Sequence, residues 1–177
     1  YHQNLDKIAL QGASIAEQIR PTLMKQMGLE SLPTLDIIFT AEDEVLNGFA
    51  VPANYTIIWV DQNDAALWTG DKKWLRTVLA HELQHLVYFN TVKGPWWLPE
   101  PMNSLVHGTP AWIVEGIAEY FTEEWRPFRY ELSHRYHVLR NTVHKIQDPH
   151  NDGYSKSLYL ADRFGDSSIS KILNHRN

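Results

Sequence analysis

The sequence contains no cysteine, so no disulfide framework holds it together and thiols give no information about its redox compartment. It also lacks an uninterrupted apolar run near the roughly 20 residues of a membrane-spanning helix, which predicts no transmembrane segment. Basic residues are scattered and outnumbered, with 16 Lys and Arg against 21 Asp and Glu and a formal net charge of -5. Neutralising a row of phosphates needs a basic cluster, so a nucleic acid partner is not expected.

Length and composition predict one domain. The chain has 177 residues, and its 44% hydrophobic content is sufficient for one substantial core. We therefore expect a single domain over residues 1–177. The sequence begins at Tyr1 with neither an initiator Met nor a basic-then-apolar leader, which suggests a processed protein or a piece of a longer chain.

The first third of the sequence predicts a helix followed by a small sheet. Residues 5–27 carry apolar side chains at the three-and-four spacing of a helix with one buried stripe, and Pro21 is a place where that helix bends or divides. Residues 34–40 and 55–60 have the composition of strands that belong to one small sheet. The polar run 41–47 and the Asn47-Gly48 pair predict a turn or short helix between the strands.

The rest of the chain is predicted to be mainly helical, which makes the expected fold α+β. From residue 74 the apolar positions wrap most of a helix, with Asp71 as its N-cap and Gly94-Pro95 ending it or its extended tail. Residues 95–107 hold three prolines and two tryptophans, which predicts a long surface loop. Thr109-Pro110 predicts a capped helix through about residue 124, and a polar turn at 147–153 interrupts the helical pattern that follows.

A pentad of the form HExxH, residues 81–85, lies inside the predicted buried helix. Residues four apart stand on the same face of a helix, so His81 and His85 can ligate one metal ion. Glu82 is offset beside them, where a carboxylate can act as general base on a metal-activated water. The pentad also fits a buried helix whose two histidines are satisfied by hydrogen bonds, so a third ligand is needed to distinguish the two interpretations.

The segment WIVEGIAEY, residues 112–120, supplies a candidate third ligand. Glu115 lies in the middle of an apolar helix, and a buried acid is costly unless it is paired or bound to a metal. Glu119 lies four residues later on the same face, so one carboxylate can bind the metal and the second can orient a ligating imidazole. Gly116 removes a side chain beside Glu115 and lets two helices approach closely. The alternative is an amphipathic surface helix with two solvated glutamates.

Taken together, HELQH and WIVEGIAEY resemble the gluzincin metallopeptidases, in which a glutamate on a later helix, often within W-x-x-E-G-x-A-E-Y, gives the third ligand. Glu115 falls at that position, 30 residues after His85 (115 − 85), and the Pro/Trp-rich segment accounts for the long interval. A closer resemblance is to the peptidase MA-like domain found in some bacterial envelope proteins. It covers residues 34 to about 173, is strongest over 74–121, and includes NGFAVP, YTIIWV, WLRTVLAHELQHLV and YLADRFG.

This resemblance implies a zincin-like fold, with a small mixed sheet over the active-site helix and a helical second half. It implies that one zinc ion, held by His81, His85 and Glu115, takes part with Glu82 in cutting the bonds of a peptide or protein substrate. An edge of the sheet, at residues 47–50 or 55–60, is expected to pair with the extended substrate. A secreted or cell-envelope location follows from the same resemblance and from the missing start.

These enzymes often add a tyrosine or histidine that stabilises the oxyanion of the reaction. Tyr154 is the first choice here, because it precedes YLADRFG. Other candidates stay open, namely Tyr130, Tyr136, His134 and His137. The remaining histidines lie in polar or terminal contexts without ligand spacing and are expected to be solvated: His2, His107, His144, His150 and His175.

Two rival functions belong to other classes. One is a non-catalytic, zinc-stabilised module that binds a protein or glycan in an aromatic groove around Trp96 and Trp97, and the intact ligands and Glu82 argue against it. The other is a helical domain that needs no metal, whose melting temperature a chelator would leave unchanged.

Overall fold

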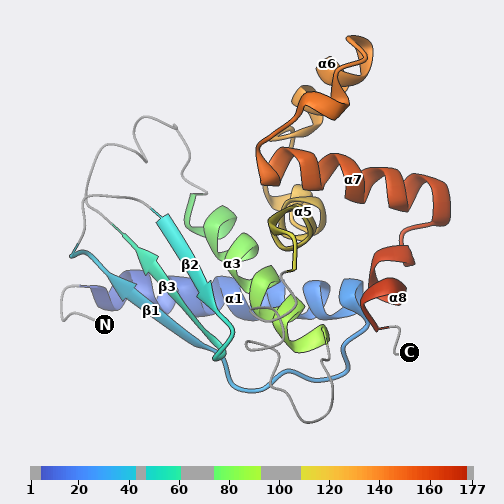
Figure 1. The fold of residues 1–177 in the computed structure, drawn as a ribbon. Coiled ribbons are helices and arrows are strands. Elements are labelled where there is room, and N and C mark those ends of the chain that lie inside the picture. The colour runs from blue at the N-terminus through green and yellow to red at the C-terminus, as the bar shows by residue number, and fades with distance from the viewer. Residues whose placement is uncertain (1–4, 43–46, 61–73, 93–108, 175–177) are drawn as a thin grey trace.

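The computed structural model describes residues 5–42, 47–60, 74–92 and 109–174 of the chain. These residues form a mostly helical structure with one three-stranded sheet, which confirms the predicted α+β class. The sheet lies to one side of helix α3 (Trp74–Thr91), and the helices of the second half lie to its other side (Figure 1). Within the described ranges, no helix combines the length and apolar character needed to cross a membrane.

The first helix, α1 (Asp6–Met27), confirms the prediction for residues 5–27. Pro21 lies inside it without dividing it. The helix ends where Gly28 adopts a left-handed conformation, with a φ of 71°, and its backbone N–H donates to the Lys25 carbonyl. The buried side chains of α1 recur along one stripe, as the apolar spacing predicted.

Three short strands form the sheet in the order β1-β3-β2. Their bounds are β1 (Asp36–Thr40), β2 (Asn47–Val51) and β3 (Tyr55–Trp59). Strand β3 pairs in parallel with β1 and antiparallel with β2, so the two predicted strands do belong to one sheet. Among the described residues, β1 and β2 are the two edges of that sheet.

Strand β2 corrects one prediction. The Asn47-Gly48 pair begins this strand, and the chain reverses after it, where Asn54 adopts a φ of 65° between β2 and β3. Asn tolerates this left-handed conformation better than most residues. The apolar signal of β2 is weak because Phe49 is 59% exposed and only Ala50 is buried.

Helices make up the rest of the described chain. Their bounds are α3 (Trp74–Thr91), α5 (Ala111–Phe121), α6 (Glu131–Leu139), α7 (Pro149–Phe164) and α8 (Ser168–Asn174), with 3-10 turns η2 (Glu123–Trp125) and η3 (Val143–Lys145). Helix α3 is buried on most sides, as predicted. The expected cap Asp71, the stop at Gly94-Pro95 and the loop 95–107 lie outside the described residues.

Two predicted helix boundaries are wrong. Helix α5 begins at Ala111 with Pro110 at the N-cap, so no Thr109 side chain caps it. The expected turn at 147–153 is mostly the first turn of α7. Asp148 is the N-cap of that helix, and its side chain accepts hydrogen bonds from the backbone N–H groups of His150 and Asn151. This cap, followed by Pro149, lets a helix begin in a segment of polar composition.

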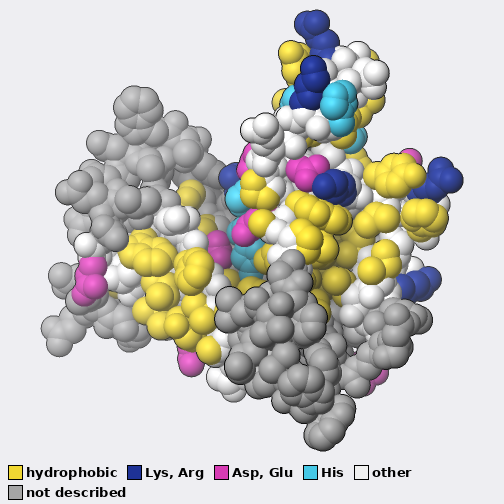
Figure 2. Space-filling view, viewed as in Figure 1, with side chains coloured by type: hydrophobic (Ala, Val, Ile, Leu, Met, Phe, Trp, Pro, Cys, Tyr) yellow, Lys and Arg dark blue, Asp and Glu magenta, His cyan; other side chains and the backbone are white. Residues whose placement is uncertain are grey.

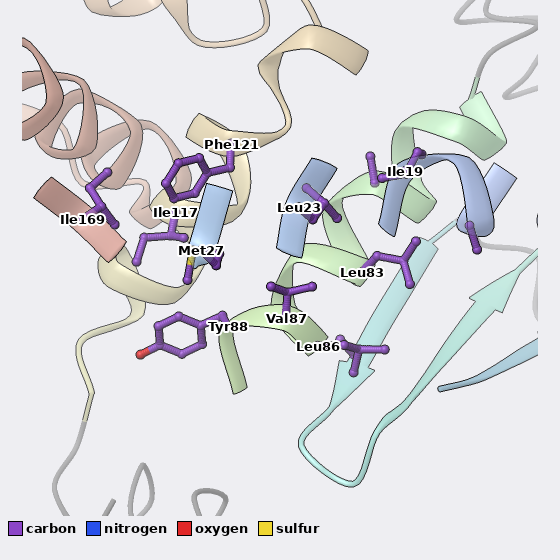
Figure 3. Close-up of a cluster of buried hydrophobic side chains, with 13 residues drawn as sticks. Ile19, Leu23, Met27, Leu83, Leu86, Val87, Tyr88, Ile117, Phe121 and Ile169 are labelled. Carbon is purple, nitrogen blue, oxygen red and sulfur yellow. The ribbon is translucent and has the colours of Figure 1, made fainter. Parts of the chain in front are cut away.

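The largest hydrophobic cluster joins α3 to three other helices (Figure 3). Its labelled members come from α1 (Ile19, Leu23, Met27), α3 (Leu83, Leu86, Val87, Tyr88), α5 (Ile117, Phe121) and α8 (Ile169). A smaller cluster of Phe39, Ile58, Val60, Leu75 and Leu79 lies between the sheet and α3. Because α3 contributes to both clusters, the pentad lies on a helix that the rest of the fold packs against from more than one side.

Helices α5 and α7 touch backbone to backbone. A Cβ atom added to Gly116 would lie 2.2 Å from the Cα of Gly153, and one added to Gly153 would lie 2.0 Å from the carbonyl oxygen of Trp112. This confirms that Gly116 permits a close helix approach. Since Gly116 follows Glu115 directly, the contact also fixes the position of that carboxylate.

We predict that Gly116→Ala and Gly153→Ala each lower the free energy of unfolding by about 1 to 3 kcal/mol, because backbone atoms must move to make room for the methyl group. The helix propensity of alanine, worth up to about 1 kcal/mol, offsets only part of this cost. Urea unfolding measures the change, and the exposed Ser14→Ala in α1 is the control, with an expected change below about 0.5 kcal/mol. Alanine variants as stable as the parent would show that the helices do not meet here.

Candidate metal centre

Helix α3 brings the two pentad histidines together. The Nε2 atoms of His81 and His85 lie 3.0 Å apart, and the rings meet edge to face with centroids 4.6 Å apart. Both side chains are buried, as the packing of α3 on most sides requires. Burial lowers the pKa of His81 to about 4, so its imidazole is neutral at neutral pH and able to bind a metal.

Glu115 reaches the same point from α5. Its Oε2 atom lies 3.4 Å from the Nε2 atom of His81 and 3.4 Å from that of His85. Ligands held at about 2.05 Å in a tetrahedron lie about 3.3 Å from one another, so these separations match those of three ligands on one small cation. The structure therefore brings together the three residues predicted to hold a metal.

A buried carboxylate and an arginine lie behind His81. The Nδ1 atom of His81 is 3.4 Å from Oε1 of Glu119, which is where a carboxylate that orients a ligating imidazole would lie. Arg126 was not foreseen from the sequence. Its Nη1 atom donates to both Glu119 oxygens, at 3.0 and 3.1 Å, and lies 3.1 Å from the same His81 nitrogen. The guanidinium fixes the position of Glu119 beside the ring. Burial nevertheless raises the pKa of Glu119 to about 7, with Arg129 acting in the opposite direction.

A second set of possible ligands, His81, Glu119 and His150, also lies within metal-binding reach. Arg126 already places a positive charge beside the His81 and Glu119 atoms of this set. A metal ion there would be repelled by the guanidinium, so the set that contains His85 and Glu115 is the better candidate.

Glu82 lies in the same pocket and is 5% exposed. Burial raises its pKa to about 7, while His85 and a backbone hydrogen bond with Ala50 of strand β2 act in the opposite direction. Gly48 makes this approach of β2 to α3 possible, because a Cβ atom there would lie 2.6 Å from the Glu82 Cγ atom. The missing side chain at Gly48 therefore leaves room for the Glu82 carboxylate.

His150 corrects another prediction, since it is not a solvated side chain. Its Nε2 atom lies 3.0 Å from Oε2 of Glu115, and its Nδ1 atom lies 3.2 Å from Oδ1 of Asp148. The hydrogen bond with Glu115 raises the pKa of His150 to about 9. The pKa of Glu115 lies well below its usual range, because hydrogen bonds from His150, His81 and His85 outweigh the effect of burial.

Tyr154, the first choice for the oxyanion residue, lies outside the lining of this pocket. The side chain is 2% exposed, and its hydroxyl donates to Oε1 of Glu123 at 2.7 Å. Burial, followed by this hydrogen bond, holds the pKa of the hydroxyl above its ordinary value. These contacts describe a packed structural tyrosine, and they give no support to a catalytic role.

The other oxyanion candidates lie in α6 or just before it, and none of them lines the metal pocket. Tyr130 comes nearest, since its ring stacks on His150 with centroids 6.4 Å apart. His134 contacts the Ser155 hydroxyl and His137 contacts the Thr142 hydroxyl, while Tyr136 is exposed. His150 could have been found in the sequence only by recognising the Asp148-Pro149 helix start that turns it towards Glu115.

The pocket around these groups has a volume of about 630 Å³. Its lining includes residues of β2, α3 and α5, together with His150 from α7. Figure 2 shows histidine and acidic side chains gathered between the sheet and the helices of the second half. One edge of the sheet thus borders the pocket that His81, Glu82 and His85 of the pentad line.

Comparisons with protein-family models, with characterised proteins and with solved structures found no match to this chain. The gluzincin and peptidase MA-like resemblance therefore rests on the sequence motifs alone.

We predict that the protein binds about one divalent metal ion per chain through His81, His85 and Glu115. Saturation at about a hundred times the dissociation constant should raise the melting temperature by roughly 5 to 10 °C relative to chelator-treated protein. His85→Ala should lose both the metal and the stabilisation, and the exposed His144→Ala is the control that should keep them. Elemental analysis and thermal melts measure the two effects. A chelator that changes neither would indicate a domain that needs no metal.

Proposed function

We propose that this protein is a zinc-dependent peptidase with a zincin-like fold. The observation that carries the proposal is the Glu82 carboxylate in the same pocket as the three converging ligand atoms of His81, His85 and Glu115. Two imidazoles and one carboxylate form a ligand set that zinc hydrolases use, and they leave a fourth position open. A zinc ion bound there would polarise a carbonyl group and lower the pKa of a water molecule near it.

Glu82 has the properties that a general base needs. With a pKa of about 7, its carboxylate can take a proton from the attacking water at neutral pH and return it to the leaving amine. The backbone hydrogen bond with Ala50 orients the carboxylate, and Gly48 leaves it room. The carboxylate is thus fixed between β2 and the proposed ligands before a substrate arrives.

Strand β2 is the sheet edge that borders the pocket, since Asn47, Gly48, Phe49 and Ala50 all line it. An extended peptide can add to such an edge through backbone hydrogen bonds. Of the two segments expected to pair with substrate, 47–50 is therefore favoured over 55–60, because β3 is the central strand and already pairs on both sides.

His150 is the residue that we assign to the oxyanion in place of Tyr154. It lines the pocket, and its ring lies over that of His81 with centroids 5.9 Å apart. Asp148 accepts a hydrogen bond from its Nδ1–H, so the ring is held with Nε2 towards Glu115. A fixed N–H donor at this place suits the negative charge that develops on a carbonyl oxygen during hydrolysis.

A zinc-stabilised binding module remains the rival function. The groove proposed for it, around Trp96 and Trp97, lies outside the described residues. The site favours the peptidase, because a binding module has no need of a buried acid with a pKa near neutrality beside the ligands.

Glu82→Gln should lower peptide hydrolysis by about 100-fold or more, because the amide cannot accept the proton. Its metal content should stay near that of the parent, since Glu82 is not a ligand. A peptide library digest followed by mass spectrometry measures activity, and the exposed Glu30→Gln in the segment after α1 is the control. Full activity in the Glu82 variant would show that the mechanism is wrong, and metal binding without any cleavage by the parent would favour the binding module.

His150→Gln should lower kcat by about 10- to 1000-fold with a smaller effect on KM, as expected for a donor that acts on the transition state. Tyr154→Phe should keep turnover within about threefold and instead lower thermal stability, because it removes a buried hydrogen bond. Steady-state kinetics on the two variants compares the roles directly. A large loss of kcat in Tyr154→Phe, with nearly normal turnover in His150→Gln, would instead support Tyr154 as the oxyanion residue.

A further inference from the structure

A second hollow adjoins the metal pocket at the N-terminal end of α3. Its volume is about 630 Å³, and it shares Thr77, Arg126 and Arg129 with the lining of the metal pocket. The two hollows therefore share a wall at these residues. A peptide long enough to extend from the metal pocket past this wall would bring one of its groups to the second hollow.

The second hollow is positively charged, although the chain as a whole carries a formal charge of -5. Three arginines line it, Arg76, Arg126 and Arg129, and Glu124 is the only acid among the described residues of its lining. Glu119, which lies behind the arginines, is paired with Arg126 at 3.0 Å and lies 3.8 Å from the Nε atom of Arg129. Even with both acids counted, the arginines leave an excess of positive charge.

Two of these arginines have donors without an acceptor. The Arg126 side chain is 9% exposed, and its Nε–H is buried with no hydrogen-bond partner among the described residues. The Nε–H of Arg76 is in the same condition, while the Nη2 atom of that side chain is held by Oε1 of Gln18 at 3.1 Å. Buried guanidinium donors are rarely left unpaired, so these two N–H groups favour an acceptor that the described residues do not supply.

Arg129 lies where the two spaces meet. Its side chain is 49% exposed, and its guanidinium lies over the Tyr130 ring, 5.3 Å from the centroid. Stacking on Tyr130 limits the motion of this long side chain. A planar guanidinium held in this way presents a fork of N–H donors that matches the two oxygens of a carboxylate.

We propose that the arginine hollow binds a carboxylate of the substrate and makes the enzyme selective for peptides that carry one near the cleaved bond. This inference rests on the proposed peptidase function and adds the substrate class. The carboxylate has two possible sources, the free C-terminus of a peptide or the side chain of Asp or Glu. Both present the same two oxygens to the guanidinium groups.

The test compares binding and cleavage of matched peptides. The neutral parent peptide has an amidated C-terminus and several glutamines. In a second set of peptides one Gln at a time is replaced by Glu, and a further peptide has the parent sequence with a free C-terminal carboxylate. Fluorescence anisotropy on zinc-loaded Glu82→Gln protein measures affinity without turnover, and kcat/KM on the active protein measures cleavage. We expect at least one carboxylate peptide to bind about tenfold or more tightly than the neutral parent, and the peptide that does so identifies the source.

Arg129→Gln and Arg76→Gln should each reduce this preference to about threefold or less. Arg163→Gln removes the same charge from the exposed end of α7 and should leave the preference intact. If a variant does not fold, the salt dependence of carboxylate selectivity in the parent protein is a second measurement. Raising the salt concentration to about 1 M should weaken carboxylate selectivity, because it shortens the screening length to about 3 Å.

Equal affinity for neutral and carboxylate peptides, or a preference that neither salt nor the arginine variants change, would overturn the inference while cleavage still upheld the peptidase. Carboxylate-selective binding without cleavage of any peptide would uphold the arginine site and reject the peptidase. The two failures are thus distinguishable.

Discussion

The convergence of two imidazole nitrogens and one carboxylate oxygen within 3.4 Å is the interaction on which the rest of the site depends. Three electron-rich atoms held this closely in a buried pocket need a proton or a cation between them. The four-residue spacing of His81 and His85 on α3 places two of these atoms on one helix face. The third depends on the contact of Gly116 with Gly153, which places α5 and therefore Glu115 against the histidines.

The same contact organises the charges around that point. By bringing α7 against α5, it delivers His150 to Glu115, so that one carboxylate faces three histidines. Behind His81, Glu119 is paired with Arg126, whereas no ion pair joins Glu82 to a basic side chain among the described residues. Burial raises the pKa of both acids to about 7, so their positions separate their roles. Glu82 faces the pocket beside the proposed ligands, whereas Arg126 holds Glu119 beside the His81 ring.

Local rules predicted the parts of this site that lie on one helix. The spacing of His81 and His85 fixes their shared face whatever surrounds them, and the apolar setting of Glu115 marked it as a costly buried acid. Arg126 and His150 were not predictable in this way, because each is brought in by a helix boundary that the polar sequence hides. Strand β2 was missed for a related reason, since an edge strand next to a pocket keeps few buried apolar positions.

A crystal of the zinc-loaded protein, with diffraction recorded on both sides of the zinc absorption edge, tests the central claim most directly. The account predicts one anomalous peak within about 2 Å of the Nε2 atoms of His81 and His85 and of a carboxylate oxygen of Glu115. A peak at His81 Nδ1 with Glu119 and His150, or no peak between the two helices, would contradict it.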